Sequence, residues 1–325
     1  MNSGNLSNNL EDNIKGEIPT PPPEPKHPIG FIKPEELKGS IRTDGKLGQG
    51  SFGSIWRITY KPTGLIYAMK CVRKTTNSVR GMALREAKIG MGISHPNVCQ
   101  TYAWSEDADM VYIIMEYIEG MDLFEFIFKN PGIFQKKLDF LWFVITCILH
   151  GLAAIHHKGF VHCDIKPENV LIGLSPDKQN VTSVKILDFG LSRPIADIQQ
   201  CAAGTHDYMA PEVATPGAYK DARLDIWSFG VLMYAMFMTG IPSQIHSLHQ
   251  DANLRKAEVI QNLCSLTTDE FKPFTRISSQ EKYARIQGFI MSCLRVNQLE
   301  RPTSQELLAK IRDFFPPVAV EKKDA

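Results

Sequence analysis

Hydrophobic and polar positions follow two different periods along this chain, and the change comes near residue 120. From residue 41 to residue 115, short runs of β-forming residues are separated by glycines and turns, and only residues 78–92 follow helical spacing. This first part is predicted to be a small antiparallel sheet with one main helix. After Gly120 the apolar segments at residues 122–129, 138–157, 223–239 and 252–315 have helical character. Strands first and helices second indicate an α+β fold.

The two ends of the chain have compositions that do not favour folding. Residues 1–40 are rich in Asn, Ser, Glu and Pro, and the stretch from Pro19 to Pro25 is proline-rich. We predict a disordered tail here. It serves either as a plain linker, which is the favoured interpretation, or as a polyproline II ligand for an aromatic groove. Residues 316–325 are predicted to be a flexible C-terminus.

The overall composition excludes several classes of protein. With 325 residues and 43% hydrophobic content the chain can bury a full core, and its net charge of +1 gives no general attraction for nucleic acid or an acidic membrane. We expect neither as a partner. The longest apolar run, residues 140–149, is shorter than the roughly 20 residues that span a bilayer, so it is interpreted as part of a core helix.

The cysteines and the N-terminus indicate where the protein works. The 7 cysteines are scattered, with no Cys-x-x-Cys pair and no Cys/His spacing typical of zinc sites, which favours a reducing compartment. The polar N-terminus lacks the charged-then-apolar order of a signal peptide. We expect an intracellular, cytoplasmic protein, and the sequence does not distinguish this from a nuclear location.

A glycine-rich motif opens the predicted sheet. Gly48-Gln49-Gly50-Ser51-Phe52-Gly53, preceded by Leu47, is a Gly-x-Gly-x-x-Gly sequence, in which backbone N–H groups can approach phosphate oxygens. A dinucleotide-binding fold would need a helix directly after this motif. Residues 55–60 alternate like a strand instead, which favours a β-hairpin flap over nucleotide phosphates.

Charged side chains within or next to apolar strands are the other candidates for chemistry. Lys70 lies in an apolar strand, where a cation needs an anionic partner such as Glu86 on the following helix. The loop at residues 162–169 combines an acid, a cation and an amide, namely Asp164, Lys166 and Asn169. Asp188 ends another apolar strand and, with Asn169, offers oxygen ligands for Mg²⁺. Taken singly, each of these residues also fits a solvated turn or helix face.

In this order the motifs resemble a eukaryotic protein kinase: glycine flap, strand lysine, helix glutamate, catalytic loop, Asp-Phe-Gly at residues 188–190 and Ala-Pro-Glu at residues 210–212. The resemblance covers residues 41–315. It implies a bilobal protein-kinase-like fold, with a small antiparallel-sheet N-lobe at about 41–115, a hinge at about 116–121 and a larger, mainly helical C-lobe at about 122–315. It also implies ATP and Mg²⁺ as cofactors.

The resemblance implies a role for each matching residue. Asp164 would accept the proton of the substrate hydroxyl, Lys166 would approach the transferred phosphoryl group, and Asn169 and Asp188 would bind Mg²⁺. The residues expected around ATP are Leu47, Gly48, Gln49, Gly50, Ser51, Phe52, Gly53, Ile55, Ala68, Lys70, Glu86, Met115 as gatekeeper, Glu116, Ile118, Asp122 near the ribose and Leu171. In the C-lobe, Glu212 would pair with Arg301.

Two residues resemble the serine/threonine-directed branch of this family: Lys166, two positions after Asp164, and Thr205, before Ala-Pro-Glu. The expected reaction is transfer of the ATP γ-phosphoryl group to Ser or Thr hydroxyls of protein substrates. A pseudokinase scaffold that binds nucleotide without turnover is the alternative, although such proteins usually lack the strand Lys or one of the two Asp residues. A small-molecule kinase is disfavoured by Ala-Pro-Glu and the helical segments after it.

Cys163 departs from the family pattern, which usually has Arg before the catalytic Asp. That Arg ordinarily receives an activation-loop phosphate, and a thiol cannot replace this charge-assisted contact. Between Gly190 and Ala210 only Ser192 and Thr205 carry Ser or Thr hydroxyls. The hypothesis is that activity does not require activation-loop phosphorylation. Cys163 itself is interpreted as an inert filler rather than as a redox group.

The packing between the lobes is a second predicted departure. The apolar residues that the family stacks behind Asp-Phe-Gly fall here on Gly90 and Thr101, so His162 and Phe189 are expected to lie under an unfilled space. Such a gap would bias the helix that carries Glu86 outward. Gly90→Leu is then expected to raise activity. Either an activating partner protein at the N-lobe holds the active arrangement, or Met91 swings in to fill the space.

Overall fold

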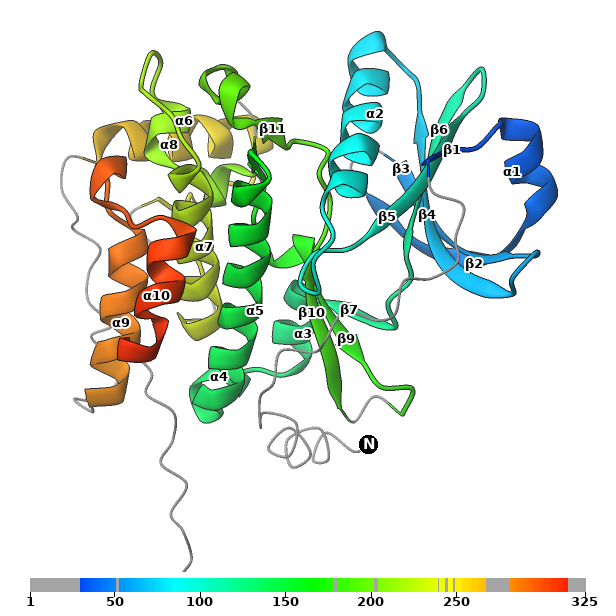
Figure 1. Ribbon diagram of the computed structural model, residues 1–325. Helices are drawn as coiled ribbons and strands as arrows, with labels where there is room; N and C mark the ends of the chain where they lie inside the picture. Colours follow the sequence, from blue (N-terminus) through cyan, green and yellow to red (C-terminus); the bar gives the residue numbers. More distant parts are fainter. Residues whose placement is uncertain are drawn as a thin grey trace, which may run out of the picture.

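The computed structural model describes residues 30–50, 53–177, 180–201, 204–238, 240–242, 245–247, 249–266 and 281–314. These residues form two lobes, with the sheet of the N-lobe on the right of Figure 1 and the helices of the C-lobe on the left. The predicted α+β, bilobal architecture is confirmed.

The N-lobe is a six-stranded sheet with one long helix. Its elements are β1 (Gly30–Phe31), α1 (Pro34–Ser40), β2 (Ile41–Gly50), β3 (Gly53–Tyr60), β4 (Leu65–Arg73), α2 (Asn77–Gly92), β5 (Thr101–Glu106) and β6 (Met110–Glu116). The strand order is β1-β5-β6-β4-β3-β2, and β1 runs parallel to β5. The Thr76 side chain accepts a hydrogen bond from Val79 N–H and so caps α2. Helix α2 packs its buried Ala83 and Ala87 against β4 and β6.

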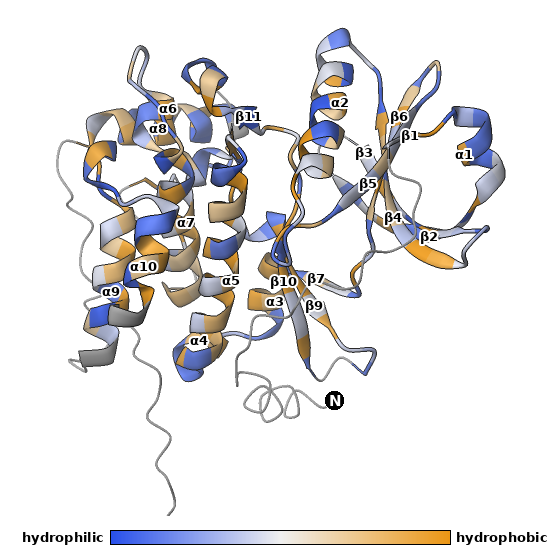
Figure 2. Ribbon diagram, viewed as in Figure 1, coloured by the Kyte–Doolittle hydropathy of each residue, from blue (hydrophilic) through white to orange (hydrophobic). Residues whose placement is uncertain are grey.

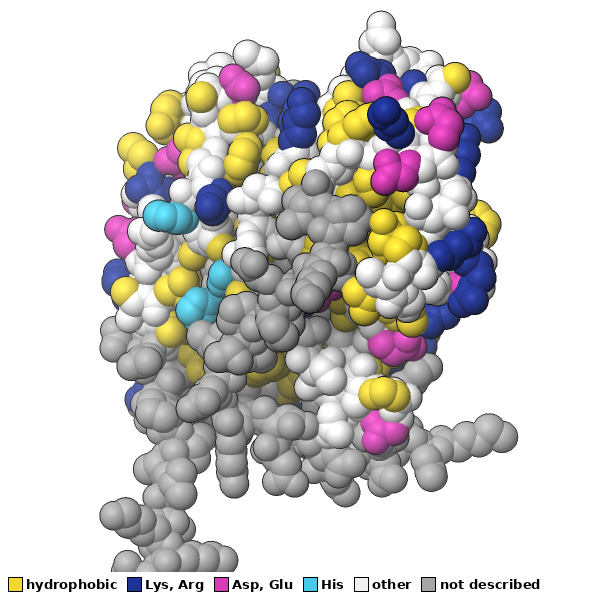
Figure 3. All heavy atoms as spheres, turned by 45° about the vertical axis from the view of Figure 1, so that its right-hand side comes forward, with side chains coloured by type: hydrophobic (Ala, Val, Ile, Leu, Met, Phe, Trp, Pro, Cys, Tyr) yellow, Lys and Arg dark blue, Asp and Glu magenta, His cyan; other side chains and the backbone are white. Residues whose placement is uncertain are grey.

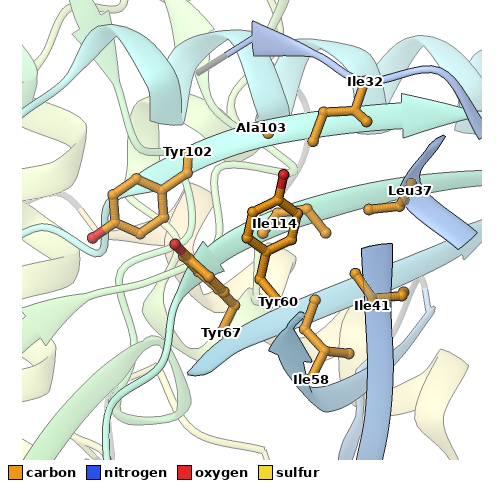
Figure 4. A pocket seen from close by; sticks show the side chains of 9 residues that line it. All are labelled: Ile32, Leu37, Ile41, Ile58, Tyr60, Tyr67, Tyr102, Ala103 and Ile114. Atoms are coloured by element: carbon orange, nitrogen blue, oxygen red, sulfur yellow. The ribbon is translucent and has the colours of Figure 1, made fainter. Parts of the chain in front are cut away.

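Residues 30–40 are folded, which corrects the predicted tail boundary at residue 40. Ile32 and Leu37 bury their side chains against the outer face of the sheet, where they pack with Ile58 and Ile114. Figure 4 shows these side chains around a cavity of only about 20 Å³. Apolar burial therefore outweighs the polar composition of this segment. Residues 1–29, including the proline-rich stretch, and residues 315–325 lie outside the described part of the chain.

The C-lobe is mainly helical. Its elements are β7 (Gly120–Asp122), α3 (Leu123–Lys129), α4 (Ile133–Lys136), α5 (Leu138–His157), β8 (Phe160–Val161), η1 (Pro167–Asn169), β9 (Val170–Leu174), β10 (Val181–Ile186), β11 (Arg193–Pro194), η2 (Ile195–Gln200), η3 (His206–Tyr208), α6 (Pro211–Ala214), α7 (Arg223–Met238), α8 (Ala252–Ser265), α9 (Glu281–Cys293), η4 (Gln298–Glu300) and α10 (Ser304–Phe314). A small sheet in the order β10-β9-β7 lies next to the hinge.

Helix α5 runs through the centre of the C-lobe and is largely hydrophobic (Figure 2). With 20 residues it is long and apolar enough to cross a bilayer by length and composition. The shortness of the apolar run at residues 140–149 therefore did not by itself exclude a membrane-spanning helix. Ten of its residues, such as Phe140, Leu152 and Ile155, are buried in the C-lobe core. Their burial supports the interpretation of α5 as a core helix.

The surface in Figure 3 carries both signs of charge. Lys and Arg side chains are interspersed with Asp and Glu side chains over the N-lobe, and hydrophobic side chains gather between them. This mixture agrees with the net charge of +1.

Candidate active site

The glycine motif forms the predicted hairpin flap. Strands β2 and β3 pair antiparallel up to Gly50 and Gly53, so a strand and not a helix follows the motif. A Cβ atom on Gly53 would lie 2.1 Å from the carbonyl oxygen of Cys71, which explains why β3 needs glycine where it meets β4. Leu47 is 46% exposed on this flap. Ser51 and Phe52 lie outside the described residues.

Lys70 lies between two carboxylates from different elements. Its Nζ is 2.7 Å from Glu86 Oε1 on α2 and 3.1 Å from Asp188 Oδ1, which follows β10. Lys70 and Glu86 are 3% and 5% exposed. The predicted pair of Lys70 and Glu86 is therefore formed, and the contact with Asp188 links the N-lobe sheet, α2 and the C-lobe.

Burial and charge act in opposite directions on these three groups. Burial disfavours the charge on Lys70, but Glu86 and Asp188 outweigh it and raise the pKa of Lys70. Burial raises the pKa of Glu86 to about 7 despite the neighbouring Lys70. Burial would also raise the pKa of Asp188, but Lys70 and the Gly190 amide outweigh it and lower that pKa. Glu86 is therefore the member of the three whose charge changes near neutral pH.

The catalytic loop holds Asp164 in a hydrogen-bond network. Its Oδ1 accepts bonds from Thr205 N–H (2.9 Å) and from the Thr205 hydroxyl (2.7 Å). Its Oδ2 lies 3.0 Å from Asn169 Nδ2 and 2.9 Å from Lys166 Nζ, and Lys166 also donates to Thr205 Oγ1 at 2.7 Å. Burial would raise the pKa of Asp164, but Lys166 and Thr205 outweigh it and keep this pKa below its usual value. Asp164 is therefore ionised at neutral pH.

A residue to which the sequence assigned no function holds this loop in place. The carboxylate of Asp225, at the start of α7, accepts hydrogen bonds from the backbone N–H groups of His162 (2.7 Å) and Cys163 (2.8 Å). His156 Nε2 lies 2.9 Å from the same carboxylate. Asp225 is fully buried. A charged residue that begins an apolar helix was the signal that could have identified it.

The residues predicted to surround adenine come from both lobes. Ile55 lies on β3 and Ala68 on β4, where Ala68 pairs with Met115 of β6, while Leu171 of β9 pairs with Asp122. The Asp122 carboxylate accepts the Glu125 N–H at 2.7 Å and caps α3. The side chain of Glu116 forms an ion pair with Lys185 at 2.9 Å, which the sequence did not predict. Ile118 lies in the hinge that follows β6.

Comparison with known proteins shows to which family this chain belongs. Residues 41–311 match the family described as "Protein kinase domain". The chain belongs to the protein kinase family. It is 37% identical over 203 residues to an Aurora kinase of Candida glabrata, which covers 61% of this chain and 53% of that protein. It is 34% identical over 235 residues to myosin light chain kinase 2 of Bos taurus, covering 70% of this chain and 36% of that protein.

A further relative is the ovarian-specific serine/threonine-protein kinase Lok of Drosophila melanogaster, 31% identical over 231 residues, 67% of this chain and 47% of that protein. This kinase chain thus spans from about a third to about half of the length of these curated relatives.

The kinase family implies ATP and Mg²⁺, and the described residues fit both. Asp188 and Asn169 provide a carboxylate and an amide, the hard oxygen donors that Mg²⁺ prefers, and the Asp188 side chain is 37% exposed. Asp188 and Asn169 would hold the metal, and Lys70 would provide the cation for phosphate oxygens. Among the described residues no group of three or more His, Cys, Asp or Glu side chains could hold a metal ion. Phosphate oxygens and water would supply the other ligands.

The predicted gap behind Asp-Phe-Gly is absent from this kinase, so that prediction is wrong. A Cβ atom on Gly90 would lie 2.2 Å from Thr101 Oγ1 and 2.9 Å from Thr101 Cβ. Helix α2 and β5 are already in contact, because glycine lets the helix approach the strand. The His162 and Phe189 rings lie 5.6 Å apart below this contact. There is therefore no physical reason to expect higher activity in Gly90→Leu.

Cys163, which the sequence predicts to replace an Arg of the family pattern, is buried in the C-lobe. It is 5% exposed, and a hydrogen bond with Cys201, followed by burial, raises the pKa of its thiol. Its Sγ lies 3.6 Å from the Val161 carbonyl oxygen. A buried thiol with a raised pKa is a poor nucleophile, which supports the interpretation of Cys163 as a filler. In the same lobe the predicted pair of Glu212 and Arg301 is formed, with two contacts of 2.6 Å.

Proposed function

We propose that this protein is an ATP- and Mg²⁺-dependent serine/threonine kinase that phosphorylates protein substrates. The observation that carries the proposal is the joint presence of the Lys70, Glu86 and Asp188 contacts and of the Asp164 network in one structure. The family match and the relatives with serine/threonine kinase names support it. Pseudokinases usually lack the strand Lys or one of the two Asp residues, and this chain has Lys70, Asp164 and Asp188, so no observation favours that alternative.

The residues of the chain act mainly by positioning and by charge. Bound ATP with Mg²⁺ supplies the phosphoryl group and neutralises its charge. Lys70, held charged by Glu86 and Asp188, binds the phosphates. Ionised Asp164 orients the substrate hydroxyl and accepts its proton, while Lys166 next to it stabilises the charge on the transferred group.

The contact between Thr205 and the catalytic loop supports the choice of Ser and Thr as acceptors. The Thr205 hydroxyl donates to Asp164 and accepts from Lys166, so it fixes the mutual position of both functional groups. Lys166 and Thr205 are the two residues that resemble the serine/threonine-directed branch, and a relative with a serine/threonine kinase name supports the same choice.

The activation segment, residues 188–212, is proposed to work without phosphorylation. Ser192 is fully buried and donates to the His162 carbonyl oxygen at 3.0 Å, and Thr205 is engaged with Asp164. Cys163 offers no charge to a phosphate. An activating partner at the N-lobe is not part of the proposal, because α2 already holds Glu86 against Lys70.

An intracellular location is also proposed. It rests on the absence of disulfides: all seven cysteines are described, and all are free thiols.

A radiolabelled phosphate-transfer assay on generic protein substrates tests the proposed activity. We expect transfer to Ser and Thr by the purified chain, and a loss of about 100-fold or more in Asp164→Asn, since general base catalysis contributes at least that factor. Transfer that is equal in both preparations would identify a contaminating kinase. Nucleotide binding without transfer would instead establish the pseudokinase alternative.

A further inference from the structure

A pocket of about 380 Å³ lies behind the hinge, and we call it the hinge-back pocket. It is lined by hinge residues, the loop after α2, helix α5 and the β9–β10 hairpin, and by none of the flap or catalytic-loop residues. Its volume is within the range of about 300–1,000 Å³ that is typical of ligand sites. Of the residues assigned to ATP, only Glu116 and Ile118 of the hinge line this pocket, so most of its wall lies outside the active site.

The walls of the hinge-back pocket combine aromatic and apolar side chains with a strand edge. Tyr117, Phe143 and Leu174 contribute the aromatic and apolar surface. Strand β10 is the outer strand of its sheet and contributes residues 182–185. The backbone of an outer strand has polar groups without strand partners, and these groups can bind a further segment of chain.

The direction of these backbone groups follows from the contacts of β10. Ile186 N–H donates to the Asn97 carbonyl oxygen and Ile186 O accepts from Cys99 N–H, both at 2.9 Å, so this residue points away from β9. Val184, two residues earlier, points the same way, and its carbonyl oxygen accepts from Asn97 Nδ2 at 3.0 Å. The N–H of Val184 is therefore directed away from β9 as well.

The chain that borders β10 turns away before it reaches the Val184 amide. Val98 N–H donates to the His95 carbonyl oxygen at 3.0 Å, and Asn97 N–H donates to His95 Nδ1 at 3.1 Å. The residues before Val98 thus form a turn and do not continue the pairing with β10. Val184 is 1% exposed, so the donors that the hinge-back pocket offers to a ligand are the hydroxyl groups of Thr182 and Ser183, with aromatic rings beside them.

We propose that the proline-rich segment of this same chain, residues 19–25, docks into the hinge-back pocket. Polyproline II segments have strong carbonyl acceptors and few N–H donors, and they bind grooves that combine aromatic rings with donors. Their stiffness keeps the entropy lost on docking small. The walls described above have this complementary composition.

The described chain begins at β1, on the side of the sheet where β5 begins. Gly30 pairs with Ala103 and Phe31 with Trp104 in parallel register, so the N-terminal end of β1 lies beside the beginning of β5. Gln100, just before β5, accepts the Glu116 N–H at 2.8 Å, and both Glu116 and Asn97 line the hinge-back pocket. Pro25 is five residues before Gly30, a reach of about 15 Å at ~3.1 Å per residue in polyproline II. Pro19, at the far end of the segment, is 11 residues before Gly30, a reach of about 34 Å. The six residues from Ala103, opposite Gly30, to Asn97 in the pocket wall span at most about 20 Å, so the segment is long enough to enter.

Docking there would tie the two lobes together. Asn97 and Glu116 belong to the N-lobe side of the pocket, while Phe143, Leu174 and Val184 belong to the C-lobe. A segment that contacts both sides spans the hinge on the face opposite to nucleotide. The proposal goes beyond phosphoryl transfer, and its test does not depend on that activity.

Hydrogen exchange of the full-length chain tests the proposal. The first variant replaces Pro21, Pro22, Pro23 and Pro25 with Ser, which removes the preference for polyproline II; we call it the four-serine variant. The second, Thr182→Trp, fills the pocket from an exposed position of β10, and Thr63→Trp in the exposed turn after β3 is its matched control. Melting temperatures establish that each variant is folded.

A tail segment with an effective concentration of about 1 mM and an intrinsic Kd of about 100 μM occupies its site about 10:1. We therefore expect amides at 116–119 and 181–185 to exchange roughly tenfold faster in the four-serine variant than in the unmodified chain. In Thr182→Trp, the amides of Thr20 and Glu24 in the displaced segment should exchange faster than in the unmodified chain, and in Thr63→Trp they should not. Exchange that is equal in the unmodified chain and the four-serine variant overturns the proposal.

A synthetic peptide of residues 17–28 provides a second measurement that does not depend on the Trp variant. It should bind the four-serine variant, whose pocket is open, with a Kd on the order of 100 μM, and the unmodified chain about tenfold more weakly because the tail competes. Equal affinity for both proteins, or no binding to either, contradicts docking of this segment. Protection of the pocket that persists in the four-serine variant would show a different occupant and also contradict the proposal.

Discussion

The close approach of α2 to β5 at Gly90 makes Gly90→Ala the most informative substitution in this kinase. The added Cβ would lie 2.2 Å from Thr101 Oγ1 and 2.9 Å from Thr101 Cβ. Carbon atoms prefer separations of about 3.5 Å or more, so α2 must move by about 1 Å. Glu86 lies one helical turn earlier on the same helix, 2.7 Å from Lys70. The same shift would take this contact beyond hydrogen-bond distance.

The expected magnitude follows from two opposing effects. Overpacking a buried contact costs about 1–3 kcal/mol, whereas replacing Gly by Ala within a helix stabilises the helix by about 1 kcal/mol. The overpacking is relieved when α2 moves away from β5. The arrangement in which Glu86 contacts Lys70 therefore becomes less favourable by about 2 kcal/mol than the arrangement in which α2 has moved away. At about 1.4 kcal/mol per factor of ten, kcat/KM for phosphate transfer should fall roughly 30-fold.

Gly81→Ala is the matched control, because Gly81 lies on the same helix with no atom within 4 Å of an added Cβ. It should stabilise the protein slightly and leave kcat/KM unchanged. Combining Gly90→Ala with Thr101→Gly removes the opposing side chain and should recover most of the activity. Unchanged or increased activity in Gly90→Ala would refute this reasoning and would restore the idea of an unfilled space above Phe189.

Three further predictions concern other groups of the structure. Because burial raises the pKa of Glu86 to about 7 and only its ionised form pairs with Lys70, kcat/KM should fall as the pH drops below 7, and this acid limb should disappear in Glu86→Gln; a limb that persists there assigns the titration to another group. Arg301→Leu leaves Glu212 charged and buried without its partner, so denaturant unfolding should show a loss of about 3–5 kcal/mol, with partial recovery in the double variant that adds Glu212→Gln; no recovery would exclude the ion pair as the cause. Phosphatase treatment should leave activity unchanged, because Ser192 is buried and Cys163 offers no charge to a phosphate; loss of activity that returns on rephosphorylation of the activation segment would contradict this.

Local patterns in the sequence were sufficient for the architecture and for the main contacts. The flap was distinguishable from a dinucleotide-binding fold because strand alternation after Gly53 is a local property. The pairing of Lys70 with Glu86 was predictable because a cation in an apolar strand requires an anion. The order of the motifs then supplied the family, which the match over residues 41–311 confirmed.

Other features depend on distances that no local pattern contains. Asp225 accepts hydrogen bonds from His162 and Cys163, which lie 63 and 62 positions away in the chain. The folding of residues 30–40 depends on an apolar sheet face that their own composition does not reveal. The hinge-back pocket is likewise formed only when hinge, α5 and β10 come together.

Gly90 shows the difference most clearly. Its position in the sequence was identified correctly, but the absence of a side chain was interpreted as an empty space. In the structure the same absence lets α2 approach Thr101 and closes that space. Sequence determines which side chains are present and where along the chain they lie. The distance between packed elements is decided by the tertiary structure, because a helix moves toward its neighbour until their atoms are in contact.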